Sequence, residues 1–123
     1  MTNANKKQVG GNHYESDGIQ HWDYCVVANV PNLEYAASKY VKRWRNKNGL
    51  QDLEKAVHYM EKRLESITHY RGCIRGARKV KHLFNQFLKD NKVPVEESVI
   101  IDTIMHWKSA VDIMTAISRL QTL

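Results

Sequence analysis

The sequence predicts an all-α protein, and three observations support this. Only two prolines and six glycines occur in 123 residues, which leaves little room for a loop-rich β sandwich. Apolar residues recur at intervals of three and four along most of the chain, as on one face of an amphipathic helix. The composition, 42% hydrophobic and 26% charged, is typical of a globular domain. We expect a small helical domain with an N-terminal polar arm, a helical hairpin and two C-terminal helices.

The first half of the chain predicts a compact three-helix unit over residues 1–68. Residues 1–18 are polar and form the arm, and a short helix runs from Ile19 to just before Pro31. Asn32 is a suitable N-cap for the second helix, which Asn48-Gly49 ends with glycine in a left-handed position. The apolar stripe of this second helix consists of Leu33, Ala36, Ala37, Tyr40, Val41 and Trp44. Its other face is basic and carries Lys39, Lys42, Arg43, Arg45 and Lys47.

The third helix is expected from Leu50 to about Thr68, and a turn of about three residues joins it to the second. Such a short turn predicts an antiparallel hairpin. Glu61 and Glu65 are one turn apart on this helix, and we interpret them as offsetting Lys62 and Arg63 on a solvated face.

The second half, residues 69–123, predicts a helical extension. After a hinge at Arg71-Gly72, the pattern indicates one helix over about 73–91. Pro94 begins a last helix over about 95–121, with Glu96 and Glu97 in its first turn. This last helix is apolar over too much of its girth for one narrow stripe. We therefore expect the extension to supply the contacts of a homo-oligomer.

The charge pattern points to a polyanionic partner. The formal net charge is +6, and residues 62–92 alone hold nine Lys/Arg against two Asp/Glu. Phosphates of a nucleotide or of a nucleic acid would complement such a region, although a basic surface that only aids solubility is an equal alternative. No apolar run approaches the ~18 residues of a membrane span, so no membrane partner is expected. Two cysteines 48 positions apart fit a reducing cytoplasm.

Several catalytic and metal-binding motifs are absent from the sequence. It has no GxxxxGK[ST] loop, no GxGxxG and no CxxC pair. His21 and Cys25 lie one turn apart on the first helix, but a catalytic zinc needs three protein ligands. We therefore predict no metal site.

Two features are candidates for phosphate binding. Gly10-Gly11 permits close backbone approach, so amides of the arm could hold phosphate oxygens beside His13 and Tyr14. Lys39 and Arg43 lie four residues apart on one helix face and could clamp one phosphate. The alternatives are an arm without a role and a basic face whose long side chains cover the hairpin.

The same residues resemble the phage nucleotide kinase family, a small phage domain also catalogued as one of unknown function. The resemblance covers about residues 8–66. It rests on His13-Tyr14, then Ile19, Trp22 and Asp23, then Lys39-Tyr40 and Arg43, then Lys47-Asn48-Gly49, and finally Asp52-Leu53, Lys55-Ala56 and Tyr59. His21 stands where the family usually has proline.

The resemblance implies a phage protein that acts on nucleotides in the host cytoplasm. It places Asp23 or His13 near the reacting group. The implied nucleotide-binding residues are Gly10, Gly11, His13, Tyr14, Trp22, Lys39, Tyr40, Arg43 and Lys47.

Three functions follow as hypotheses. One is a nucleoside monophosphate kinase without a P-loop, using ATP and Mg²⁺. The second is a non-catalytic sponge that sequesters a signal nucleotide of host defence. The third, ranked last, is a nucleic-acid-binding protein that uses Lys42, Arg43 and Arg45 with the cluster from Arg71 to Lys81.

Overall fold

The computed structural model describes residues 18–70 and 75–123, and these residues are all-α as expected. Within these two ranges the chain forms six α-helices, one short 3₁₀ helix and no strand. In chain order the elements are α2 (His21–Ala28), α3 (Asn32–Arg43), η1 (Trp44–Asn46), α4 (Leu50–His69), α5 (Lys81–Asp90), α6 (Val95–Met105) and α7 (Ala110–Leu120).

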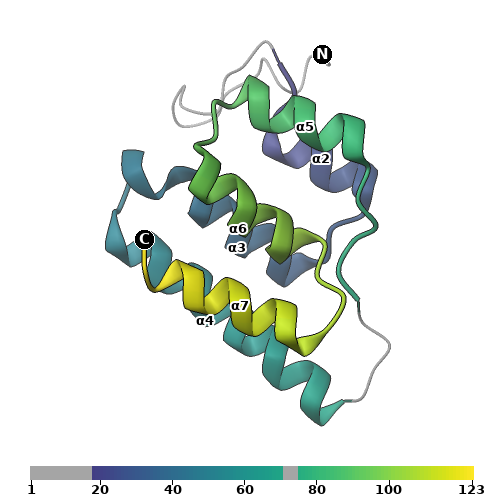
Figure 1. The fold of residues 1–123 in the computed structure, drawn as a ribbon, viewed down its shortest axis with the longest axis vertical. Coiled ribbons are helices and arrows are strands. Elements are labelled where there is room, and N and C mark those ends of the chain that lie inside the picture. The colour runs from purple at the N-terminus through teal and green to yellow at the C-terminus, as the bar shows by residue number, and fades with distance from the viewer. Residues whose placement is uncertain (1–17, 71–74) are drawn as a thin grey trace.

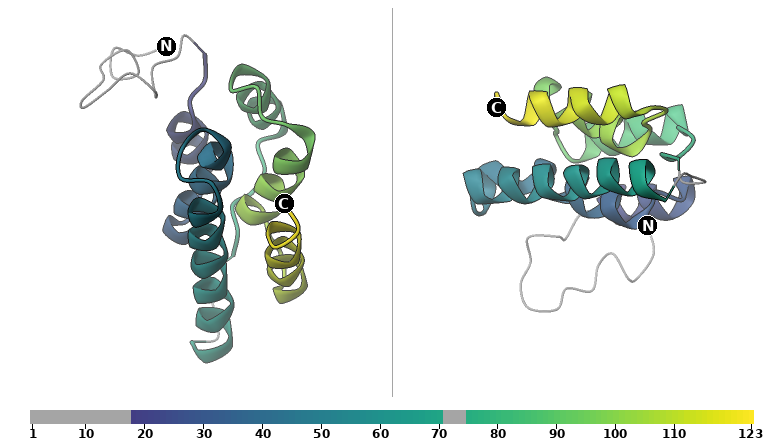
Figure 2. Two further views of the ribbon diagram at one scale, coloured as in Figure 1. Left: turned by 90° about the vertical axis from the view of Figure 1, so that its left-hand side faces the viewer. Right: turned by 90° about the horizontal axis from the view of Figure 1, so that it is seen from below.

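The helices form two layers of three. Figure 1 shows α5, α6 and α7 in front of α2, α3 and α4, and the left view of Figure 2 shows the two layers edge-on. Each front helix packs on one behind it: α5 on α2, α6 on α3 and α7 on α4. The most extensive packing is between α3 and α4, which form the predicted hairpin.

One hydrophobic core lies between the layers and joins both halves of the chain. Its largest fully buried side chains include Tyr24, Met60, Phe84, Phe87 and Ile101. The boundary expected at residues 68–69 coincides with the end of α4 at His69. Residues on both sides of it contribute to the same core.

Gly49 lies in the connection between α3 and α4 and has the predicted positive φ, at 57°. Its N–H donates to the carbonyl of Trp44 (2.9 Å). Glycine tolerates this region without the steric cost of a Cβ atom. The α3–α4 turn is therefore encoded locally. No helix in the described ranges is long and apolar enough to span a bilayer.

The helix expected over 73–91 is wrong in its first half, because α5 begins only at Lys81. Residues 75–80 are not helical and run along the turn between α6 and α7. The Ala77 N–H donates to the Met105 carbonyl (2.7 Å), and a Cβ on Gly76 would lie 2.5 Å from the Trp107 backbone nitrogen. This close tertiary approach overrides the helical pattern. The expected hinge at Arg71-Gly72 lies outside the described residues.

The single helix expected over 95–121 is also wrong, since the chain turns at residues 106–109 to give α6 and α7. The Asp112 carboxylate accepts the Lys108 N–H (2.8 Å) in the first turn of α7, and Trp107 turns into the core. From residue 75 on, the extension therefore has three helices rather than two. Each of α6 and α7 buries its own apolar face within the chain. Val99 of α6 and Val111 and Met114 of α7 stay exposed, and homo-oligomerisation stays a prediction.

Candidate phosphate-binding face

A buried ion pair fixes α3 against α4. Glu34 of α3 is fully buried, and Arg63 of α4 is 4% exposed. The Arg63 Nε and Nη2 groups each donate to one Glu34 oxygen at 2.9 Å, a two-pronged geometry that holds both side chains in one orientation. The Trp107 indole N–H donates to the same carboxylate. The expectation that Arg63 lies on a solvated face is therefore wrong, whereas Lys62 does pair with Glu65 there (3.3 Å).

Two tyrosines stack across the outer surface of this hairpin. Tyr40 of α3 and Tyr59 of α4 have ring centroids 5.9 Å apart and planes 13° from parallel. The Arg43 guanidinium lies 4.7 Å from the Tyr40 centroid, and the Lys55 ammonium lies 5.2 Å from it. Both distances are within the range of cation–π attraction. We call Lys39, Tyr40, Arg43, Lys55 and Tyr59 the α3–α4 face.

Arg43 is oriented by the buried carboxylate of Asp52. Their closest atoms are Arg43 Nε and Asp52 Oδ2, at 3.4 Å. Asp52 lies in the first turn of α4, where it also accepts the backbone N–H of Asn48 (3.3 Å). Asp52 therefore fixes the start of α4 and the direction of Arg43 together. Lys47 lies exposed in the same turn.

The positive potential of α3 extends to the buried His21. Burial, together with the charges of Lys42 and Lys39, lowers the pKa of His21 to about 3. His21 hydrogen-bonds the Ser38 hydroxyl (2.8 Å) and lies 3.7 Å from the Cys25 sulfur. Burial raises the pKa of Cys25 to about 12. At neutral pH both groups are uncharged, and they pack the α2–α3 contact.

The remaining predicted site residues lie on α2 or outside the described residues. Asp23 accepts the Gln20 N–H (2.8 Å) and is part of the capping box that begins α2. Asp23 is the residue expected near the reacting group, and this capping role engages one of its two carboxylate oxygens. Trp22, next to it, is 43% exposed. The candidates Gly10, Gly11, His13 and Tyr14 all fall in residues 1–17, which are not described.

The predicted site lacked three residues: Lys55 and Tyr59 of the α3–α4 face, and the buried Asp52 that orients Arg43. All three belong to the sequence pattern that carries the family resemblance. Lys55 and Tyr59 are four residues apart, the spacing that places two side chains on one helix face, so the sequence held a signal for them.

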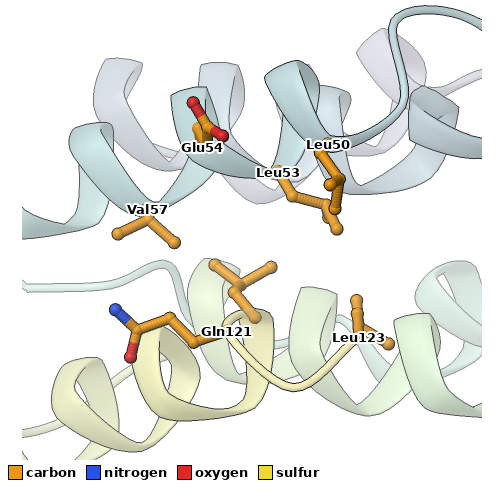
Figure 3. A pocket seen from close by; sticks show the side chains of 7 residues that line it. Leu50, Leu53, Glu54, Val57, Gln121 and Leu123 are labelled. Atoms are coloured by element: carbon orange, nitrogen blue, oxygen red, sulfur yellow. The ribbon is translucent and has the colours of Figure 1, made fainter.

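A separate apolar groove lies between α4 and the C-terminal end of α7. It has a volume of about 290 Å³. Figure 3 shows Leu50, Leu53 and Val57 on one side and Leu123 on the other. None of the predicted site residues from Trp22 to Lys47, the part of that set that the structure describes, lines it. Within the described residues, no three His, Cys, Asp or Glu side chains come together in a way that would hold a metal ion.

Comparison with known proteins gives no further guide. No protein-family model, no curated protein and no solved structure matches this chain.

Proposed function

We propose that this chain binds nucleotides, with the phosphates on the α3–α4 face. The observation that carries the proposal is the stacked Tyr40–Tyr59 pair with the cations of Arg43 and Lys55 over one ring. Arg43 offers planar N–H donors that suit phosphate oxygens, while Lys39 and Lys55 act as point charges. The face of a tyrosine ring gives a nucleobase a surface on which to stack.

Binding without turnover is the form of the proposal that the geometry favours. Asp23 has one carboxylate oxygen in the α2 capping box, and Asp52 is buried between Arg43 and Asn48. The described carboxylates do not form a magnesium site, so we derive no step through that ion. The second candidate is the nucleoside monophosphate kinase that the family resemblance implies, using ATP and Mg²⁺. In either form the protein acts on nucleotides in the host cytoplasm, as that resemblance implies.

Binding and turnover are separated by two measurements on one protein sample. The first is isothermal titration with nucleoside mono-, di- and triphosphates and with cyclic nucleotides. The second is incubation with ATP, magnesium and deoxynucleoside monophosphates, followed by chromatography. A saturable titration with every nucleotide recovered unchanged identifies a binding protein. Appearance of a diphosphate identifies the kinase, and absence of any binding overturns the proposal.

The site is tested by Lys55→Gln, with Lys62→Gln as its matched control. Both lysines lie on α4, and each substitution removes one positive charge. Loss of one charged contact to phosphate weakens binding by about tenfold, corresponding to about 1.4 kcal/mol. The control is expected to bind as the wild type does. Equal weakening in both variants would show a general charge effect and refute the assignment of the face.

A further inference from the structure

A second basic surface lies on the non-helical residues 75–80 and on Lys81, the first residue of α5. We propose that residues 75–81, which we call the basic strap, bind single-stranded nucleic acid. The strap runs along the right-hand edge of the molecule in Figure 1, between the end of α4 and the start of α5. It contacts the α6–α7 turn and α2, not the α3–α4 face, so the inference is independent of the nucleotide proposal.

The backbone of the strap is held at two points. At one, the Ala77 N–H donates to the Met105 carbonyl (2.7 Å), and the missing Cβ of Gly76 lets the chain pass against Trp107. At the other, the Val80 N–H donates to the Tyr24 hydroxyl (3.2 Å). The same hydroxyl bonds His106 Nε2 (2.7 Å). Because the backbone of the strap is anchored, less conformational entropy is lost when a ligand binds to its side chains.

The side chains of the strap present positive charge outward. Arg75, Arg78 and Lys81 are exposed, and none of them has an ion-pair partner in residues 18–70 or 75–123. Lys79 is the member whose charge is offset, by Asp102 of α6 (2.9 Å). No acidic residue occurs between positions 75 and 89 of the sequence. This part of the surface therefore carries an uncompensated charge of three.

The spacing of these cations favours a flexible polyanion. Residues three apart on non-helical backbone are up to about 10 Å apart. Long Arg and Lys side chains on such a backbone reach successive phosphates of an unpaired strand, which adjusts its own spacing. Tyr70, at the end of α4, is 79% exposed and offers a ring on which a base could stack. Cations along a backbone together with exposed aromatic rings are the usual means of binding a single strand.

The test measures binding of a fluorescein-labelled oligothymidylate of about 20 nucleotides by anisotropy, at about 50 to 200 mM salt. The strap variant is Arg75→Gln/Arg78→Gln/Lys81→Gln. Its control is Lys62→Gln/Lys89→Gln/Lys92→Gln, which removes the same charge from exposed positions elsewhere. Circular dichroism establishes that each variant is folded.

The strap variant is expected to bind at least tenfold more weakly at the lowest salt. The slope of log affinity against log salt should be shallower by about 2, since each lost phosphate contact on a single strand contributes about 0.7. The control and Lys55→Gln should keep the wild-type slope. Three results would overturn the proposal: no binding by the wild type, equal loss in the control, or tighter binding to a duplex of the same length.

Discussion

Replacing Arg63 by methionine should remove a large part of the stability of this fold. The substitution keeps an unbranched apolar side chain in the same space but leaves the Glu34 carboxylate buried without its cation. That carboxylate is fully buried and receives two Arg63 donors at 2.9 Å. Breaking a buried pair of this kind costs about 3 to 5 kcal/mol. Domains of this size unfold with a free energy of about 5 to 15 kcal/mol, so the loss is easily measured.

Urea unfolding followed by circular dichroism measures the effect. With a slope of about 1 to 3 kcal/mol per molar urea, the midpoint for Arg63→Met should fall by about 2 M. Lys62→Met is the matched control: Lys62 neighbours Arg63 and pairs with Glu65 in solvent, so its loss should cost less than about 1 kcal/mol. The double variant Glu34→Leu/Arg63→Met should recover part of the stability, because it removes the unpaired charge but leaves the Trp107 indole N–H without its acceptor. An Arg63→Met midpoint equal to that of the control would refute this account of the hairpin.

Three further predictions concern His21, Gly76 and Cys25. The unfolded chain protonates His21 near pH 6.5 and the folded chain only near pH 3, so the stability that His21 contributes is present above pH 6.5 and lost as the pH falls. Wild type should therefore lose roughly 4 kcal/mol more than His21→Gln between those pH values, measured by urea unfolding. Gly76→Ala should destabilise by about 1 to 3 kcal/mol, because its Cβ meets the Trp107 backbone, and an unchanged melting temperature would contradict this contact. In a Cys73→Ser background, Cys25 should react with a thiol reagent at pH 8 only as fast as the protein opens, because its pKa is about 12.

Local signals in the sequence were sufficient for the hairpin. Asn32 was wrong as the N-cap, because Pro31 takes that position and Asn32 is the first residue of α3; Gly49 adopts the predicted positive φ. The break between α6 and α7 also had a local signal, because Ser109 and Asp112 have the spacing of a helix-start box. The apolar pattern that continues through the break concealed it. The strap had no such signal, since Gly76 is explained only by its approach to Trp107, 31 positions away.

The hydrophobic pattern of the sequence did not predict the buried charged residues, for a different reason. Glu34 and Arg63 are 29 positions apart, and each looks like an ordinary exposed residue of an amphipathic helix. Glu97 is similar: it is 1% exposed, and its carboxylate accepts the indole N–H of Trp44 and the Nε–H of Arg45. A charge is buried only where its partner has been brought to it by the fold. Which residue becomes that partner therefore depends on the tertiary structure and cannot be predicted from the local sequence.

The buried Glu34 and Glu97 and the partly exposed Asp102 also decide which cations are available to a ligand. Glu34 engages Arg63, Glu97 engages Arg45, and Asp102 engages Lys79. Lys55 of the α3–α4 face and Arg75, Arg78 and Lys81 of the strap have no acidic partner within the described residues.

A net charge of +6 thus includes surplus cations on two separate surfaces. If positive charge served solubility alone, exposed lysines and arginines would be interchangeable. The strap variant and its control would then bind the oligonucleotide with equal affinity. Lys55→Gln and Lys62→Gln would likewise bind a nucleotide with equal affinity. Unequal effects in both pairs would show that position, and not only net charge, determines what this protein binds.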